Sequence, residues 1–175
     1  STRDRLLAQY RDLPSLDRTA LEVLACWCCR PFLPPPGESD VLEVLQKHAS
    51  LQALYNLQHH GIVRHDLINQ SYSFADDDYL PVLIHEQMDL KVRGTLHATI
   101  AALLDTHGGT TPQLRQTIRF HRAFSAISPI AVRNCIVLGR EFLQNGMCLS
   151  AIELLEKARN QIGSSQWKLR STIEL

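Results

Sequence analysis

Apolar side chains recur every three or four residues along most of this chain, and this spacing predicts a mainly helical protein. The stretches with such a pattern are 3–11, 15–29, a run that begins at residue 39, 50–60, 76–88, 90–107, 112–127 and the long stretch 130–163. Two short runs, 62–65 and 71–74, have the residue types of strands and flank a polar turn. The sequence therefore predicts one small β-hairpin among helices.

Capping and turn residues mark several of the predicted helix boundaries. Ser15 or Asp17 is expected to cap the second helix, and Ser50 is expected to cap the helix that precedes the hairpin. Gly61 is expected to end that helix. The stretch 30–37 contains four prolines, so it predicts a stiff loop rather than a helix.

The predicted helices at 15–29, from residue 39 and at 50–60, followed by a hairpin, have the order of a winged-helix domain, which we expect over residues 1–107. In that arrangement the helix at 50–60 would be the recognition helix, and the residues around Asn69 would form the wing. A DNA-reading version presents Lys and Arg there, but this helix has neither. Three aspartates, 76–78, follow the wing and would repel phosphate. The pattern favours a winged helix that does not read DNA.

The stretch 130–163 predicts two antiparallel helices that meet at a stop signal, Asn145-Gly146. Small and bulky side chains alternate where the two helices would touch, at Leu138, Gly139, Phe142, Ala151, Leu155 and Ala158. This spacing resembles one tetratricopeptide repeat, a 34-residue helix–turn–helix unit. Cys135 stands where the repeat usually has Trp, and Gly163 stands where Pro usually ends it. An ordinary helical hairpin with small residues at its crossing is the alternative.

One such hairpin cannot bury its apolar face alone, so a repeat needs neighbours. The residues after Gly163, SSQWKLRSTIEL, are similar to the first helix of a following repeat that is cut off at Leu175. We therefore expect a helical-repeat (tetratricopeptide-like) segment over residues 108–175, truncated at its C-terminal end. The fold class predicted for the whole chain is mainly α, a winged-helix-like domain with a small β-hairpin followed by tetratricopeptide-like helical hairpin repeats.

Over most of its length the chain resembles the winged-helix and tetratricopeptide-like region of STAND-type signal-transduction ATPases, which are related to AAA machines. The stretches that carry the resemblance are RTALEVL (18–24), LQALYNLQHHGIV (51–63), YSF (72–74) and LHATIAALL (96–104). The resemblance implies a winged helix that packs on a nucleotide-binding domain and a repeat array that holds a partner.

Two departures from that family bear on nucleotide binding. In many members a winged-helix His contacts the phosphate of bound ADP, and Asp76 occupies the corresponding place here. No Gly-x-x-x-x-Gly-Lys-Ser/Thr phosphate loop occurs in the chain. If the parent protein is an ATPase, we expect its nucleotide-binding domain to lie upstream of this chain, and we predict no cofactor for the chain itself.

Composition narrows the class of protein further. The 18 Lys and Arg balance the 18 Asp and Glu, whereas a dedicated nucleic-acid binder usually has a basic surplus. No apolar run approaches the length of a membrane span, and the N-terminus has no signal-peptide pattern. We therefore expect a cytoplasmic protein that binds neither nucleic acid nor membrane.

The five cysteines and eight histidines do not form a recognised catalytic or metal-binding motif. The cluster Cys26-Trp27-Cys28-Cys29 lies on a strongly apolar helix, where burial raises a thiol pKa and makes the thiol a poor nucleophile. We expect free, buried cysteines, no metal site and no enzymatic activity.

The predicted function is that of a non-catalytic regulatory and protein-interaction region, which couples an upstream ATPase domain to a helical-repeat binding surface. Its candidate protein-binding residues are Arg133, Asn134, Arg140 and Glu141, on the first helix of the hairpin, although the same residues also fit an ordinary solvated face. The partner would be a protein or a neighbouring ATPase domain, and an oligomer is possible. The alternatives are a winged-helix DNA-binding transcription regulator and a simple helical adaptor without a winged helix.

Overall fold

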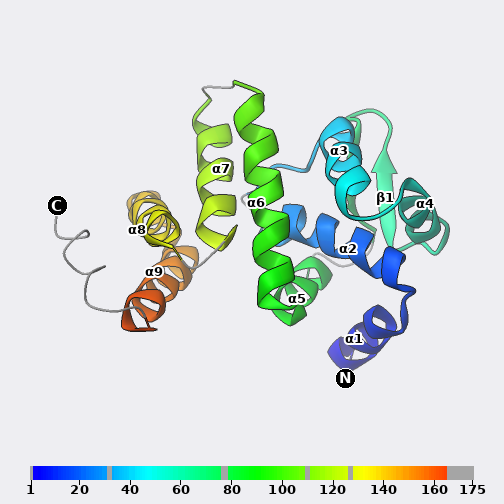
Figure 1. Ribbon diagram of the computed structural model, residues 1–175, viewed down its shortest axis with the longest axis horizontal. Helices are drawn as coiled ribbons and strands as arrows, with labels where there is room; N and C mark the ends of the chain where they lie inside the picture. The colour runs from blue at the N-terminus through cyan, green and yellow to red at the C-terminus, as the bar shows by residue number, and fades with distance from the viewer. Residues whose placement is uncertain (1, 31–32, 76–78, 109–110, 126–127, 165–175) are drawn as a thin grey trace. The chain divides into compact units, whose positions relative to one another are not determined.

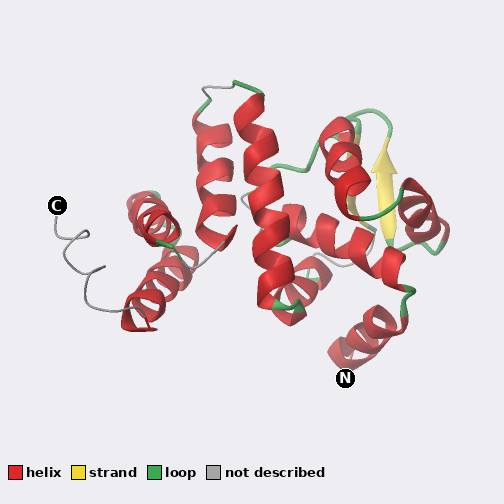
Figure 2. Cartoon of the chain, in the orientation of Figure 1, coloured by secondary structure: helices red, strands yellow, loops and turns green. Residues whose placement is uncertain are grey.

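The structure is a computed structural model that describes residues 2–30, 33–75, 79–108, 111–125 and 128–164 (Figure 1). The described part is mainly helical, with one small antiparallel sheet, as the hydrophobic pattern predicts (Figure 2). Its helices are α1 (Thr2–Asp12), α2 (Ser15–Cys28), α3 (Glu38–His48), α4 (Leu51–His59), α5 (Leu80–Gln87), α6 (Leu90–Thr106), α7 (Pro112–Ser125), α8 (Pro129–Gln144) and α9 (Cys148–Ser164). The strands are β1 (Val63–Asp66) and β2 (Ser71–Phe74).

The chain divides into two compact units, Ser1–Arg93 and Gly94–Leu175. The division falls inside α6, near its first turn. The boundary predicted between a domain over 1–107 and a repeat segment over 108–175 stays a prediction. Two features of the sequence lie outside the described residues, namely the three aspartates at 76–78 and most of the segment after Gly163 that is similar to a further helix.

The first unit is built around α2. This helix buries an almost continuous apolar surface, formed by Ala20, Leu21, Val23, Leu24, Ala25, Cys26 and Trp27. It packs against α3, α4, α5 and β2, and Figure 1 shows α2 with α3 and α5 on either side of it. A helix that is apolar on most sides must be covered on most sides, and its neighbours in the unit cover α2 in this way.

The hairpin is a two-stranded antiparallel sheet in which Val63 pairs with Phe74 and Asp66 with Ser71. A third segment joins it, because Gly37, at the end of the proline-rich loop, forms an isolated antiparallel bridge with Ser71. The N–H of Glu38 donates to the carbonyl oxygen of Gln70 at 2.8 Å, beside that bridge. The loop 33–37 is therefore fixed to the hairpin immediately before α3 begins.

The predicted helix caps are partly confirmed. The Ser50 side chain accepts a hydrogen bond from the Ala53 N–H at 3.2 Å, as a capping serine should. The predicted cap of α2 is wrong, because Pro14 occupies the N-cap position and no side chain caps the helix. Asp17 instead turns inward, is only 6% exposed, and accepts hydrogen bonds from the Asn56 amide of α4 at 3.2 and 3.4 Å.

In the second unit, α8 and α9 form the predicted helical hairpin. α8 ends at Gln144 with Asn145 as its C-cap, and Gly146 follows with φ +74°, a conformation that glycine adopts without strain. A Cβ at Gly139 would lie 2.9 Å from Leu155 Cγ on α9, so the two helices approach as closely as the sequence predicts. A second close approach joins α6 to α7, where a Cβ at Gly94 would lie 2.6 Å from the Ser125 carbonyl oxygen.

Candidate functional site

The four residues predicted to bind a protein lie on α8, but they do not act alike. Arg133 and Arg140 are both exposed. They are seven residues apart, which is nearly two helical turns, so they share one face of the helix with their Cα atoms about 10 Å apart along its axis. The Asn134 amide donates to the Ile130 carbonyl oxygen at 2.9 Å, which ties it to its own helix.

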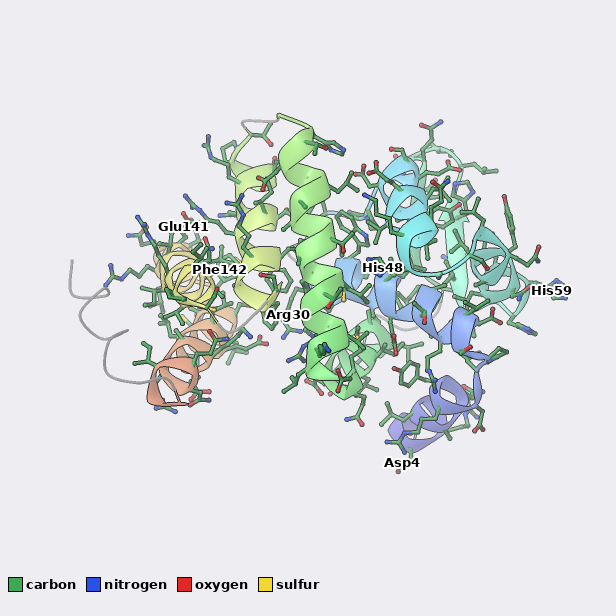
Figure 3. The ribbon with its side chains drawn as sticks, viewed as in Figure 1. Asp4, Arg30, His48, His59, Glu141 and Phe142 are labelled. Carbon is green, nitrogen blue, oxygen red and sulfur yellow. The ribbon has the colours of Figure 1, made fainter. Side chains whose placement is uncertain are left out.

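Glu141 serves chiefly to join two helices. Its carboxylate forms an ion pair with Arg119 of α7, and both side chains are about one-third exposed. Figure 3 labels Glu141 beside Phe142, whose side chain is buried in the core of the hairpin. The structure therefore leaves Arg133 and Arg140 as the accessible charges of the predicted set, and assigns Glu141 a structural contact.

Formal charge is divided unequally between the two units, although it sums to zero over the chain. The unit Ser1–Arg93 has nine Lys and Arg against thirteen Asp and Glu, a formal net charge of −4. The unit Gly94–Leu175 has nine Lys and Arg against five Asp and Glu, a formal net charge of +4. The basic surplus thus lies in the unit that contains α8, and the unit that contains the β-hairpin is acidic.

The surface of α4 displays uncharged side chains. Gln52, Tyr55 and His59 are exposed on this helix, and Tyr55 is 60% exposed. Figure 3 shows His59 at the outer side of α4. Asn56, the other polar residue of the central turn, is held by the buried carboxylate of Asp17. α4 therefore offers no Lys or Arg, and it exposes the large aromatic ring of Tyr55.

The tip of the β-hairpin exposes two apolar side chains in a well-defined turn. Leu67 is 79% exposed and Ile68 is 93% exposed. Asp66 orders this turn, because its Oδ1 accepts hydrogen bonds from the N–H groups of Ile68 and Asn69, at 2.9 and 3.1 Å. The Asn69 side-chain amide also donates to Asp66 Oδ2 at 2.7 Å, and this hydrogen bond, together with the two from the backbone, lowers the pKa of the Asp66 carboxyl.

Arg64 and His65 of β1 both form contacts inside the first unit. The Arg64 guanidinium donates to the Ala75 carbonyl oxygen at 2.8 Å. His65 Nε2 lies 3.2 Å from Glu38 Oε2, and the His65 ring stacks on Tyr72 with a centroid separation of 4.6 Å. In a DNA-reading wing, an arginine such as Arg64 would bind phosphate. Here Arg64 instead holds the end of the β-hairpin through its hydrogen bond to Ala75.

The second unit contains a buried pair of histidines that the sequence pattern did not indicate. His97 of α6 and His121 of α7 are completely buried, with their Nδ1 atoms 2.7 Å apart. One imidazole must donate and the other accept, so the contact needs at least one neutral ring. Burial lowers the pKa of His121 to about 3. The pair is packed against the rings of Phe120 and Phe124.

The cysteines are free, as the sequence predicts, but they are not all buried. Cys148 is exposed and Cys28 is partly exposed. Burial raises the pKa of the Cys28 thiol to about 12 and that of Cys135 to about 11, so neither is a ready nucleophile. Within the described residues, no group of three or more Cys, His, Asp or Glu side chains is arranged to hold a metal ion.

Comparison of the chain with protein-family models, with curated proteins and with solved structures finds no match. In the part of the chain that the structure describes, no helix combines the length and the apolar character needed to cross a bilayer. The functional argument therefore depends on the geometry of the surfaces described above. The name α4–hairpin surface is used below for three exposed residues of the first unit, namely Tyr55 on α4 and Leu67 and Ile68 at the tip of the β-hairpin.

Proposed function

We propose that this chain is a non-catalytic protein-interaction and regulatory region, in which a winged-helix-like unit docks on a neighbouring ATPase or effector domain. The element order supports the winged-helix interpretation. The bridge between Gly37 and Ser71 also fixes the loop before α3 to the β-hairpin, so that α3 and the hairpin belong to one unit. A plain helical adaptor would lack a hairpin between residues 62 and 74, and a hairpin is present there.

The observation that carries the proposal is the chemistry of the α4–hairpin surface. A DNA-reading surface neutralises phosphates with Lys and Arg. This surface instead presents Tyr55, Leu67 and Ile68 to solvent, within a unit of formal net charge −4. Exposed aromatic and aliphatic side chains on a rigid support are typical of protein contacts, where large apolar groups fill pockets on the partner.

The order of the turn adds to this argument. A flexible loop loses conformational entropy when it binds, at a cost of about 0.5–1.5 kcal/mol for each side chain that becomes fixed. Asp66 already fixes the backbone of the turn through its two hydrogen bonds, and the bridge from Gly37 supports the strand behind it. Leu67 and Ile68 are therefore presented in a preorganised form.

The tetratricopeptide-like hairpin would provide the second surface of the region. Arg133 and Arg140 are two exposed guanidinium groups on one face of α8, in the unit with the basic surplus. Their charge favours an acidic segment of a partner protein, and their separation of two turns favours two acidic groups rather than one. Glu141 would act indirectly, since its ion pair with Arg119 holds α8 on α7.

The proposal is tested by placing a photo-reactive benzoylphenylalanine at position 68 or at position 90. Leu90 is the matched control, because it is also an exposed aliphatic residue of the first unit, 71% exposed, and lies away from the hairpin in sequence. After irradiation in cells, we expect position 68 to cross-link to a protein with a nucleotide-binding or effector domain, and position 90 not to. Cross-linking of position 68 to nucleic acid, or identical products from both positions, would contradict the proposal.

A further inference from the structure

A pocket of about 610 Å³ lies within the first unit, between α1 and the end of the hairpin. Leu21 of α2, Ile62 before β1 and Phe74 of β2 supply apolar lining. Its volume falls in the range of roughly 300–1,000 Å³ that is usual for small-molecule sites. None of the residues that carry the proposed docking function lines this pocket, so it raises a separate question of function.

The polar lining comes largely from one face of α1. Arg5, Gln9 and Asp12 all line the pocket, and their spacing of four and three residues places them in one row along the helix. Arg5 and Asp12 are both exposed, and neither forms a hydrogen bond or ion pair with another described residue. They lie seven residues apart, about 10 Å along the helix axis, which is too far for a direct ion pair between their side-chain heads in this row.

The stability of α1 does not explain this placement of charge. A cation near the N-terminal end of a helix and an anion at its last residue both oppose the helix dipole. Asp4 and Arg11, which have the favourable placement, do not line the pocket. The two charges that line the pocket therefore both occupy positions that are unfavourable for the helix itself.

The wall that carries these charges is fixed to the rest of the unit. The Tyr10 hydroxyl donates to Glu22 Oε1 of α2 at 2.5 Å, and burial together with this contact raises the pKa of Tyr10. Arg11 reaches Gln87 of α5 with a separation of 3.4 Å. These contacts hold α1 against α2 and α5, so the row formed by Arg5, Gln9 and Asp12 keeps its position over the apolar lining.

We propose that this pocket binds a small amphipathic zwitterion, with an anionic group at Arg5, a cationic group at Asp12 and an apolar body against Leu21, Ile62 and Phe74. The Gln9 amide lies between the two charged ends and can donate to or accept from a polar group in the middle of the ligand. A ligand with only one charge would pair with either Arg5 or Asp12 and leave the other side chain in water.

The test uses 8-aminooctanoate, whose amine and carboxylate stand about 10 Å apart when extended, a span that matches two turns of helix. Octanoate and octylamine are the comparison probes, because each lacks one of the two charges. Binding is followed by the amide signals of Gly61, Ile62 and Ala75 in ¹H–¹⁵N correlation spectra. We expect 8-aminooctanoate to bind more tightly than either comparison probe by about threefold, since an exposed ion pair contributes roughly 0.2–1 kcal/mol.

Substitutions assign each end of the ligand. Arg5→Gln should reduce the affinity for 8-aminooctanoate to that for octylamine, and Asp12→Asn should reduce it to that for octanoate. Arg18→Gln removes a cation that does not line the pocket and should change nothing. None of the three replaced side chains is buried, so each variant is expected to fold. Amide signals that are unchanged away from the substituted residue verify this. Equal binding of all three probes, no shift at the pocket amides, or an unaltered affinity in Arg5→Gln would overturn the proposal.

Discussion

Acidification should destabilise the unit Gly94–Leu175 through His121. The folded state holds this imidazole neutral, because burial lowers its pKa from 6.5 to about 3. In the unfolded chain the same imidazole takes up a proton as the pH falls below about 6.5. The unfolded state then binds more protons than the folded state, so the free energy of unfolding falls as the pH is lowered through the window from 6.5 to about 3.

The size of the effect follows from the two pKa values. Each pH unit within the window costs up to about 1.4 kcal/mol, the free energy of one proton equilibrium per unit. Between about pH 7 and about pH 5, the unfolded imidazole goes from mostly neutral to almost fully protonated, and the expected loss is about 2 kcal/mol. That loss is a substantial fraction of the 5–15 kcal/mol that stabilises a typical domain.

The assay is urea unfolding of the wild-type chain and of His121→Asn, at both pH values. Asparagine can place a polar atom near the position of Nδ1 beside His97, but it does not titrate. The variant should be less stable than the wild type near pH 7, and its stability should change less on acidification, by about 2 kcal/mol. The other histidines are present in both proteins, so the difference between the two pH dependences reports on the buried pair of His97 and His121.

Two results would refute this reasoning. The first is an equal loss of stability in wild type and variant, which would mean that His121 titrates alike in the folded and unfolded states. The second is a histidine NMR titration in which the His121 ring protonates near pH 6.5 without unfolding. Either result would require that water reaches the ring, contrary to its complete burial.

Three further substitutions test individual contacts by urea unfolding. Gly139→Val inserts a side chain where a Cβ would already lie 2.9 Å from α9, and should cost about 1–3 kcal/mol, whereas Gly163→Ala has open space and should cost nothing. Equal effects would refute the close crossing. Asn56→Ala should cost about 1–3 kcal/mol because it removes the amide that serves the buried Asp17 carboxylate, and an unchanged midpoint would show that this contact is not maintained in solution. Ser50→Ala should cost about 1 kcal/mol through loss of the α4 cap, while Ser50→Asn should be nearly neutral; a loss in both would indicate a role other than capping.

Local features of the fold could be predicted because they depend on neighbours in sequence. Helical spacing, the Asn145-Gly146 stop and the Ser50 cap each act within a few residues, and the structure confirms them. The hairpin follows from two strand-like runs around a polar turn. Capping of α2 by Ser15 or Asp17 was wrong because Pro14 takes the cap position and a tertiary contact turns the Asp17 carboxylate inward.

Features that depend on distant residues could not be read from the pattern. His97 and His121 are 24 residues apart and meet only because α6 and α7 pack together. The bridge from Gly37 to Ser71 joins a proline-rich loop to a strand, and no periodicity marks it. The role of Glu141 was missed for the same reason, since only the packed helices bring Arg119 to it. The opposite charges of the two halves, in contrast, are a signal that the sequence alone contains.

A titration with duplex DNA tests the central claim most directly, because the α4–hairpin surface is proposed to bind protein and not nucleic acid. The measurement is fluorescence anisotropy of a labelled duplex of about 20 base pairs, at low and at physiological salt, since phosphate contacts strengthen steeply as salt falls. We predict no binding by the wild-type chain at either salt concentration. Binding at low salt that weakens as salt rises, and that is lost in Arg64→Gln, would contradict the account and assign the hairpin to DNA.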